Sequence, residues 1–160
     1  MGSTISTEIL WEWLESVPDP EIPVLSVVDL GIIRDVEIVD DDSNSHVVIT
    51  VSPTYSGCPA TEVIAGDITS ELKRRDIDKV EIKTRIAPPW TTDWITEKGR
   101  DKLRRYGIAP PEHLSPGSTP DCPNCNSENT ERLSQFGSTP CKALYRCREC
   151  LEPFDYFKCL

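Results

Sequence analysis

Four cysteines near the C-terminus constrain this chain more than any other feature. They form two Cys-x-x-Cys pairs, Cys122 with Cys125 and Cys147 with Cys150, and 21 residues separate the pairs. A tetrahedral metal ion needs four soft ligands, and each tight turn can deliver two thiolates to one point. The spacing therefore predicts a structural zinc ribbon over residues 122–160. Paired disulfides or a chance repeat are the alternatives.

The N-terminal sequence and the number of cysteines indicate a reducing compartment. The chain of 160 residues holds seven cysteines, and its first 17 residues contain no Lys or Arg. A secretory signal needs a basic start and an apolar run, and a transit peptide needs Arg, so we expect a cytoplasmic protein. Thiols stay reduced there, which favours metal ligands or reactive groups over disulfides. No apolar run approaches the about 20 residues of a membrane span.

The acidity of the chain is concentrated in its first third. The net charge is −10, and residues 1–60 hold 11 acidic residues against a single basic one, Arg34. Phosphate binding needs a basic face, so we expect no nucleic-acid partner. The charge distribution favours protein partners instead.

Residue patterns before the cysteine pairs predict helices and strands of an α/β (α+β) domain. The elements expected are a helix capped by Ser6 and ending near Val17, strands over 32–39 and 46–51, a helix over 60–75, a strand over 79–86 and a helix over 92–106. The first two strands should form a hairpin, and the strand–helix–strand step implies a parallel pair. We expect a two-layer domain of a small mixed sheet with helices over 1–107, a Pro-rich linker over 108–121 and the ribbon over 122–160.

Cys58 is the second candidate site. It directly precedes Pro59 and the helix predicted from Ala60, so we expect it at the helix N-cap, where the dipole favours a thiolate. The local sequence leaves open whether it is a nucleophile, a labile metal ligand or an inert buried residue. His46 should lie about 20–30 Å away at the far end of a strand, and His113 lies in the linker, so a cysteine hydrolase is disfavoured.

Other polar and aromatic residues have structural and functional interpretations. Asp19, Glu21 and Asp29 are expected as turn and cap residues on a solvated face, with a polar rim near Cys58 as the alternative. Trp90 and Trp94 favour a core or staple role over a partner surface.

Two further cysteines, Cys141 and Cys159, could each replace a ligand of the predicted metal site. We favour small buried residues in the aromatic-rich tail, because the two pairs already complete a tetrahedron.

Several motifs together resemble a known family. Residues 19–23 (DPEIP), 29–31 (DLG) and 54–60 (TYSGCPA) resemble the iron–sulfur cluster assembly domain, also called DUF59. With residues 89–94 (PWTTDW), 136–147 (FGSTPCKALYRC) and 152–159 (EPFDYFKC), nearly the whole chain is similar to the family of D subunits of bacterial phenylacetyl-CoA epoxidases.

This resemblance implies an accessory or maturation role in phenylacetate catabolism. The family's loop cysteine matches Cys58, which would bind an iron–sulfur cluster transiently, and zinc would be structural. The expected partners are the oxygenase and iron–sulfur reductase components of the epoxidase. A second chain, in a homodimer for example, would supply the ligands that one thiolate cannot. A non-catalytic scaffold or regulatory subunit is the alternative, and thiol enzymology at Cys58 is disfavoured by the distant histidines.

Overall fold

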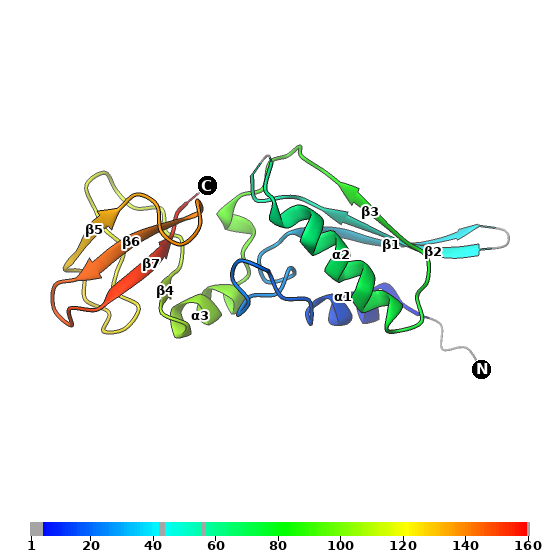
Figure 1. Ribbon diagram of the computed structural model, residues 1–160, viewed down its shortest axis with the longest axis horizontal. Helices are drawn as coiled ribbons and strands as arrows, with labels where there is room; N and C mark the ends of the chain where they lie inside the picture. Colours follow the sequence, from blue (N-terminus) through cyan, green and yellow to red (C-terminus); the bar gives the residue numbers. More distant parts are fainter. Residues whose placement is uncertain (1–4, 42–43, 56, 160) are drawn as a thin grey trace. The chain divides into compact units, whose positions relative to one another are not determined.

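The computed structural model describes residues 5–41, 44–55 and 57–159. It divides the chain into two compact units, one ending at Thr96 and one beginning at Glu97 (Figure 1). Each unit is described by itself below. Among the described residues, no helix combines the length and the apolar character needed to cross a membrane.

The first unit contains a three-stranded mixed sheet. Its strands are β1 (Ile33–Asp41), β2 (Asn44–Val51) and β3 (Val80–Thr84), in the order β1-β2-β3. β1 and β2 pair in antiparallel fashion and β2 and β3 in parallel, which confirms the predicted hairpin and the strand–helix–strand step. Both hairpin strands extend beyond the predicted limits, and the middle of the predicted polar turn, residues 42 and 43, lies outside the described residues.

Two helices pack on this sheet. The helices are α1 (Thr7–Leu14) and α2 (Ala60–Lys73), which contact one another and lie on the same side of the strands (Figure 1). Ser6 caps α1 as predicted, because its hydroxyl accepts a hydrogen bond from the Ile9 amide. α2 buries Ile64, Ile68 and Leu72, whereas Val63 is half exposed.

An acidic side chain completes the buried face of α2. Glu71 is buried and accepts hydrogen bonds from Ser16 Oγ and from the guanidinium groups of Arg74 and Arg75. Burial of a carboxylate is tolerated when it is paired in this way. The helix therefore turns the face that carries residues 64, 68, 71 and 72 to the core.

The predicted helix over 92–106 is in fact two short helices. Residues Thr92–Trp94 form a 3-10 turn, η1, and α3 begins only at Glu97 and ends at Arg105. Ile95 between them is extended and buried, and the Thr96 amide donates to the Asp29 carbonyl. These long-range contacts anchor the chain in a conformation that a continuous helix could not adopt.

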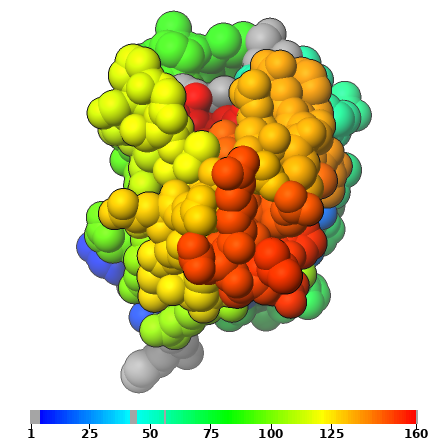
Figure 2. Space-filling view, turned by 90° about the vertical axis from the view of Figure 1, so that its left-hand side faces the viewer, coloured from blue at the N-terminus to red at the C-terminus, as the bar shows by residue number. Residues whose placement is uncertain are grey.

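The second unit is a four-stranded sheet. Its strands are β4 (Ile108–Ala109), β5 (Thr130–Ser134), β6 (Lys142–Cys147) and β7 (Pro153–Phe157), in the order β4-β7-β6-β5. Residues before β5 (yellow) and residues of β5 to β7 (orange to red) lie together on the face that Figure 2 presents. β4 comes from the segment predicted as a linker and pairs in parallel with β7. The two compact units divide between residues 96 and 97, and this boundary is earlier than the predicted domain end at 107.

Candidate functional site

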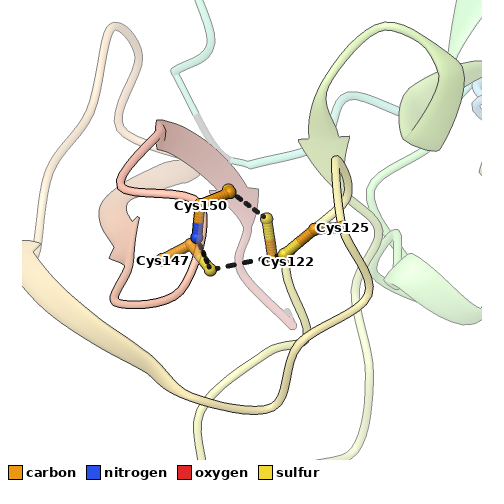
Figure 3. Close-up of side chains that lie close together, drawn as sticks. All are labelled: Cys122, Cys125, Cys147 and Cys150. Carbon is orange, nitrogen blue, oxygen red and sulfur yellow. Dashed lines mark hydrogen bonds between the residues drawn. The ribbon is translucent and has the colours of Figure 1, made fainter.

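The four cysteines of the two pairs lie on two facing turns of the second unit. Cys122 and Cys125 lie in the loop before β5, Cys147 is the last residue of β6, and Cys150 lies in the turn between β6 and β7 (Figure 3). Their side chains point toward one another, although 21 residues separate the pairs in the sequence. The folding of β5 against β6 brings the two turns together, because Thr130 pairs with Cys147.

Each turn is closed by a residue in the left-handed backbone region. Asn126 follows Cys125 with a φ of 62°, and Leu151 follows Cys150 with a φ of 65°. Asn tolerates this conformation, whereas it is strained for Leu. The Sγ atom of Cys147 accepts hydrogen bonds from the backbone amides of Glu149 and Cys150. The Cys-x-x-Cys spacing alone did not predict these two left-handed residues.

The sulfur geometry fits a tetrahedral metal ion. The four Sγ atoms lie within 4.8 Å of one another, with Cys122 to Cys150 at 3.7 Å and Cys125 to Cys147 at 3.5 Å. Four sulfurs at the usual zinc distance of about 2.3 Å lie about 3.8 Å apart. A disulfide would need an S–S distance of about 2.05 Å, so the alternative of paired disulfides is wrong here.

The protonation of these thiols points to a cation among them. Burial opposes ionisation of Cys147, but the amides of Cys150 and Glu149 and the neighbouring thiols lower its pKa to about 7. The backbone of Glu152 favours the thiolate of Cys150, yet burial and the three other cysteines outweigh it and raise its pKa to about 12. One thiolate therefore forms readily and a further one is resisted by like charge. A divalent ion would remove that repulsion, so the donor set fits a bound metal.

The cysteine cluster is also part of the small core of this unit. Cys122 and Cys147 are completely buried, and they pack in one cluster with Ala109, Ala143, Tyr145, Phe154 and Tyr156. Tyr145 stacks on Phe154 and meets Tyr156 edge to face. A metal ion held here would therefore stabilise the packing of β4, β6 and β7.

The two remaining cysteines of this unit stay outside the cluster. Cys141 is buried beside the Thr139 hydroxyl, as expected for a small core residue. Cys159 is exposed, with its Sγ atom 3.6 Å from His113 Nδ1, so the expectation of burial was wrong for it. It lies beyond the end of β7, where the chain leaves the core.

Cys58 lies in the loop between β2 and α2 of the first unit, and its side chain is half-buried. Its Sγ atom lies 3.9 Å from Thr54 Oγ1, its amide donates to the Tyr55 carbonyl, and its carbonyl accepts from the Thr61 amide. The N-cap of α2 is Pro59, so Cys58 precedes the cap by one residue instead of occupying it. Pro59 has helical backbone angles, but α2 itself begins only at Ala60, and this places the cap at Pro59.

The acidic residues before β1 hold turns together. Asp19 is buried and its Oδ2 accepts from the amides of Glu21 and Ile22. Asp29 is buried and exchanges hydrogen bonds with Ser26, whose amide donates to Asp29 Oδ2 while its hydroxyl accepts from the Asp29 amide. Both are turn and cap residues as predicted, but they are buried and not on a solvated face.

The two tryptophans around η1 have different surroundings. Trp90 is buried and its indole N–H donates to the Leu30 carbonyl at 2.8 Å, which confirms a core role. Trp94 is half-buried, and the Arg34 guanidinium lies 3.6 Å from the centroid of its ring. Arg34 was missed in the sequence, although its being the single basic residue among the first 60 was an available signal.

Family models match both parts of the chain. Residues 8–83 match the model described as "Iron-sulfur cluster assembly protein", and residues 109–158 match the "PaaD zinc beta ribbon domain". The fold and the cysteine cluster thus define an iron–sulfur cluster assembly domain followed by a zinc β-ribbon. A protein of Escherichia coli (strain K12), named as a candidate D subunit of 1,2-phenylacetyl-CoA epoxidase, is 47% identical over 94% of this chain and 92% of its own length. The chain belongs to this family of phenylacetyl-CoA epoxidase D subunits.

Other relatives match the first unit. The "Fe-S protein maturation auxiliary factor YitW" of Bacillus subtilis (strain 168) is 36% identical over 58% of this chain and 80% of its own length. Among solved structures, a DUF59 domain from Bacillus anthracis has a TM-score of 0.52 and 28% identity, covering 60% of this chain and 89% of that one. A conserved hypothetical protein from Thermotoga maritima has a TM-score of 0.51 and 28% identity, covering 64% of this chain and 98% of its own.

Proposed function

We propose that this protein is an accessory factor that assists iron–sulfur cluster assembly or delivery to a phenylacetyl-CoA epoxidase. The observation that carries the proposal is the combination of two likenesses in one chain. The first unit is similar to proteins named as Fe–S maturation factors, and the full length is similar to a protein named as an epoxidase subunit. An accessory factor joined to a client-specific module would have both. We expect it to work in the cytoplasm and to catalyse no reaction on the epoxidase substrate.

Cys58 is the residue proposed to contact the cluster. It is half-buried on a loop and not sealed in the core, so its sulfur can reach a ligand after modest movement of that loop. An iron–sulfur cluster takes about four cysteine ligands, and one thiolate supplies only the first. The others would come from the partner chain or from a second copy of this protein. Incomplete ligation suits a carrier, because a cluster held by few protein ligands can be passed on.

Zinc is the metal proposed for the second unit. The four thiolates would close its tetrahedral coordination, leaving no open position for a substrate. Zinc has no redox chemistry, and its contribution here is to hold the two Cys-x-x-Cys turns together. The second unit would then serve as the docking module for the oxygenase and reductase components.

The function is tested by the Cys58→Ala variant in cells that express the epoxidase components. We expect the reductase component to be purified with less iron and labile sulfide per chain than with the wild type. Cys159→Ala is the matched control, since that thiol is also accessible but lies outside both proposed sites. A reductase that acquires its full cluster with Cys58→Ala would sink the proposal.

Elemental analysis of protein purified without oxygen separates the two metal roles. Zinc should be present in about equal amounts in the wild type and in Cys58→Ala, because the four-cysteine cluster does not include this residue. Iron should accompany only the wild type. Iron in the four-cysteine site of the Cys58→Ala variant would contradict the zinc assignment.

A scaffold or regulatory subunit is the second candidate function. It is favoured by large apolar side chains on the surface of the second unit, Leu133, Phe136 and Leu151, which are 50%, 59% and 69% exposed. Exposed apolar side chains often mark protein interfaces. Stable co-purification with the oxygenase in equal amounts, unaffected by Cys58→Ala, would support this function over cluster delivery.

A further inference from the structure

Arg34 is held at the end of the sheet from which the Cys58 loop starts. The register of β1 against β2 shifts between Ile33 and Asp35, which leaves Arg34 as the extra residue of a bulge. Its guanidinium carbon, Cζ, lies over the Trp94 ring at 3.6 Å from the ring centroid, and its Nη1 donates a long hydrogen bond of 3.5 Å to the Gly31 carbonyl. The stacked ring fixes the position of the charge.

A second arginine lies across β2 from the first. Arg85 directly follows β3, and its amide donates to the Val51 carbonyl at the end of β2. The Arg34 guanidinium is partly desolvated, which lowers its pKa, and the positive charge of Arg85 lowers this pKa further. The two side chains are therefore near enough to repel one another.

Neither arginine has an acidic partner within the part of the chain that the structure describes. Among the described residues, no ion pair joins Arg34 or Arg85 to a carboxylate, and the buried Nε of Arg34 makes no hydrogen bond. This is unexpected at the end of a unit whose first 60 residues carry 11 acidic side chains. A guanidinium that has lost water without gaining a full set of partners gains more from an anion than a fully solvated one.

Ser52 connects both arginines to the Cys58 loop. It is buried and begins that loop, its amide donates to the Ile32 carbonyl before Arg34, and its hydroxyl donates to the Arg85 carbonyl at 2.9 Å. Two residues later Thr54 approaches the Cys58 sulfur at 3.9 Å. Arg34, Arg85 and the start of the loop that carries Cys58 therefore lie at the same end of the sheet.

We propose that Arg34 and Arg85 form an anion-binding subsite next to Cys58, and that it takes the negative charge of a thiolate-ligated iron–sulfur cluster. This inference rests on the proposed function for the identity of the ligand, but not for the existence of the subsite. A cluster ligated by thiolates is anionic, because the summed negative charge of its sulfides and thiolates exceeds the positive charge of its iron ions. Two unpaired cations beside a single cysteine would hold such a cargo where one Fe–S bond alone is insufficient.

Sulfate tests the subsite without any cluster. We would titrate the full-length protein with sulfate at low ionic strength and follow backbone amide and arginine Nε–H signals by NMR. Saturable shifts centred on Arg34 and Arg85 are expected in the wild type and equally in Cys58→Ala. Arg34→Gln and Arg85→Gln should each weaken sulfate binding by about tenfold, since each removes a charge-assisted hydrogen bond. If both variants bind sulfate as tightly as the wild type, the proposed subsite is wrong.

Matched variants separate a local site from folding and net charge. Arg34→Lys keeps the charge but loses the planar stack, so intermediate affinity is expected. Arg132→Gln removes an exposed arginine of the second unit and should leave sulfate binding unchanged. Thermal unfolding of each variant shows whether it still folds. Where an Arg34 variant does not fold, the sulfate affinities of Arg85→Lys and Arg85→Gln are compared instead.

Cluster transfer tests the ligand. A glutathione-ligated [2Fe–2S] complex would be mixed with each variant without oxygen, and uptake followed by visible circular dichroism. Uptake about tenfold weaker in Arg34→Gln and Arg85→Gln supports the assignment. Uptake equal to wild type in both variants overturns it. Failure of the proposed function is distinguishable, because the wild type would then take up no cluster at Cys58 while still binding sulfate.

Discussion

At the scale of single residues, Gly31 determines how closely the segment around η1 can approach β1. Its φ is 70°, and a Cβ atom at this position would lie 2.4 Å from the Trp94 carbonyl oxygen and 2.8 Å from the Trp94 Cβ. Both the backbone angle and the space therefore require glycine. Because Trp94 supports Arg34, this glycine indirectly sets the position of the proposed anion subsite.

We expect Gly31→Ala to lower the free energy of unfolding by about 2–4 kcal/mol, from the left-handed backbone and from the contact with Trp94. Gly66→Ala is the control, since this glycine lies within α2 and a Cβ there meets nothing within 4 Å. It should raise stability by about 0.5–1 kcal/mol. Urea unfolding followed by tryptophan fluorescence measures both, and equal effects of the two variants would contradict the account.

Residue-level prediction succeeded where chemistry restricts the choice of side chain. Four cysteines in two close pairs leave few alternatives to a metal site, so the cluster could be predicted from spacing alone. Arg34 could not be identified in this way. Its partner Trp94 lies 60 positions further along the chain, and no local pattern indicates a stack between them.

At the scale of elements, the turn between β6 and β7 has a strained residue where its partner turn does not. Leu151 adopts a φ of 65° with its side chain 69% exposed, so it has the cost of the left-handed region with little gain from burial. Leu151→Gly should raise the free energy of unfolding of the second unit by about 1 kcal/mol. Asn126→Gly, at the equivalent place of the other turn, should change it by only a few tenths, since Asn tolerates this conformation.

Thermal unfolding of the metal-loaded protein, monitored by hydrogen exchange in β6 and β7, is the measurement for this pair of variants. A loss of stability in Leu151→Gly would mean that the side chain makes contacts worth more than the backbone strain. Under the scaffold function, the exposed Leu151 side chain would contact a partner protein. This contact would explain why a strained residue occupies this position.

Elements with their own periodicity were predictable, and those fixed by distant contacts were not. α2 and the β1–β2 hairpin follow from their apolar patterns and polar turn. The helix predicted over 92–106 failed because Trp90 and Ile95 are both buried against the first unit's core, which fixes the backbone between them. The pattern of residues in this segment allows a helix, and tertiary packing overrides it.

At the scale of the whole molecule, the two units depend on different sources of stability. The first unit has an apolar core whose members include Leu10, Ile49 and Ile68, none of which is exposed. In the second unit, one core cluster has seven buried members, and two of them are the cysteines Cys122 and Cys147. Small units with such cores usually need a metal or disulfide to remain folded. The linker prediction failed to foresee β4, since a two-residue strand is visible only once β7 is in place.

Removal of the metal should therefore unfold one unit and spare the other. We expect a strong chelator, or Cys147→Ser, to abolish amide protection in β5, β6 and β7 while protection in β1, β2 and α2 of the same full-length chain persists. The reason is that the metal ion joins the two Cys-x-x-Cys turns, and two of its cysteine ligands, Cys122 and Cys147, belong to the small core of the second unit. Cys141→Ser is the control, as it changes a buried cysteine outside the cluster. Loss of protection in both units together, or in neither, would contradict this prediction. It would show that the four-cysteine metal site does not stabilise the second unit independently of the first.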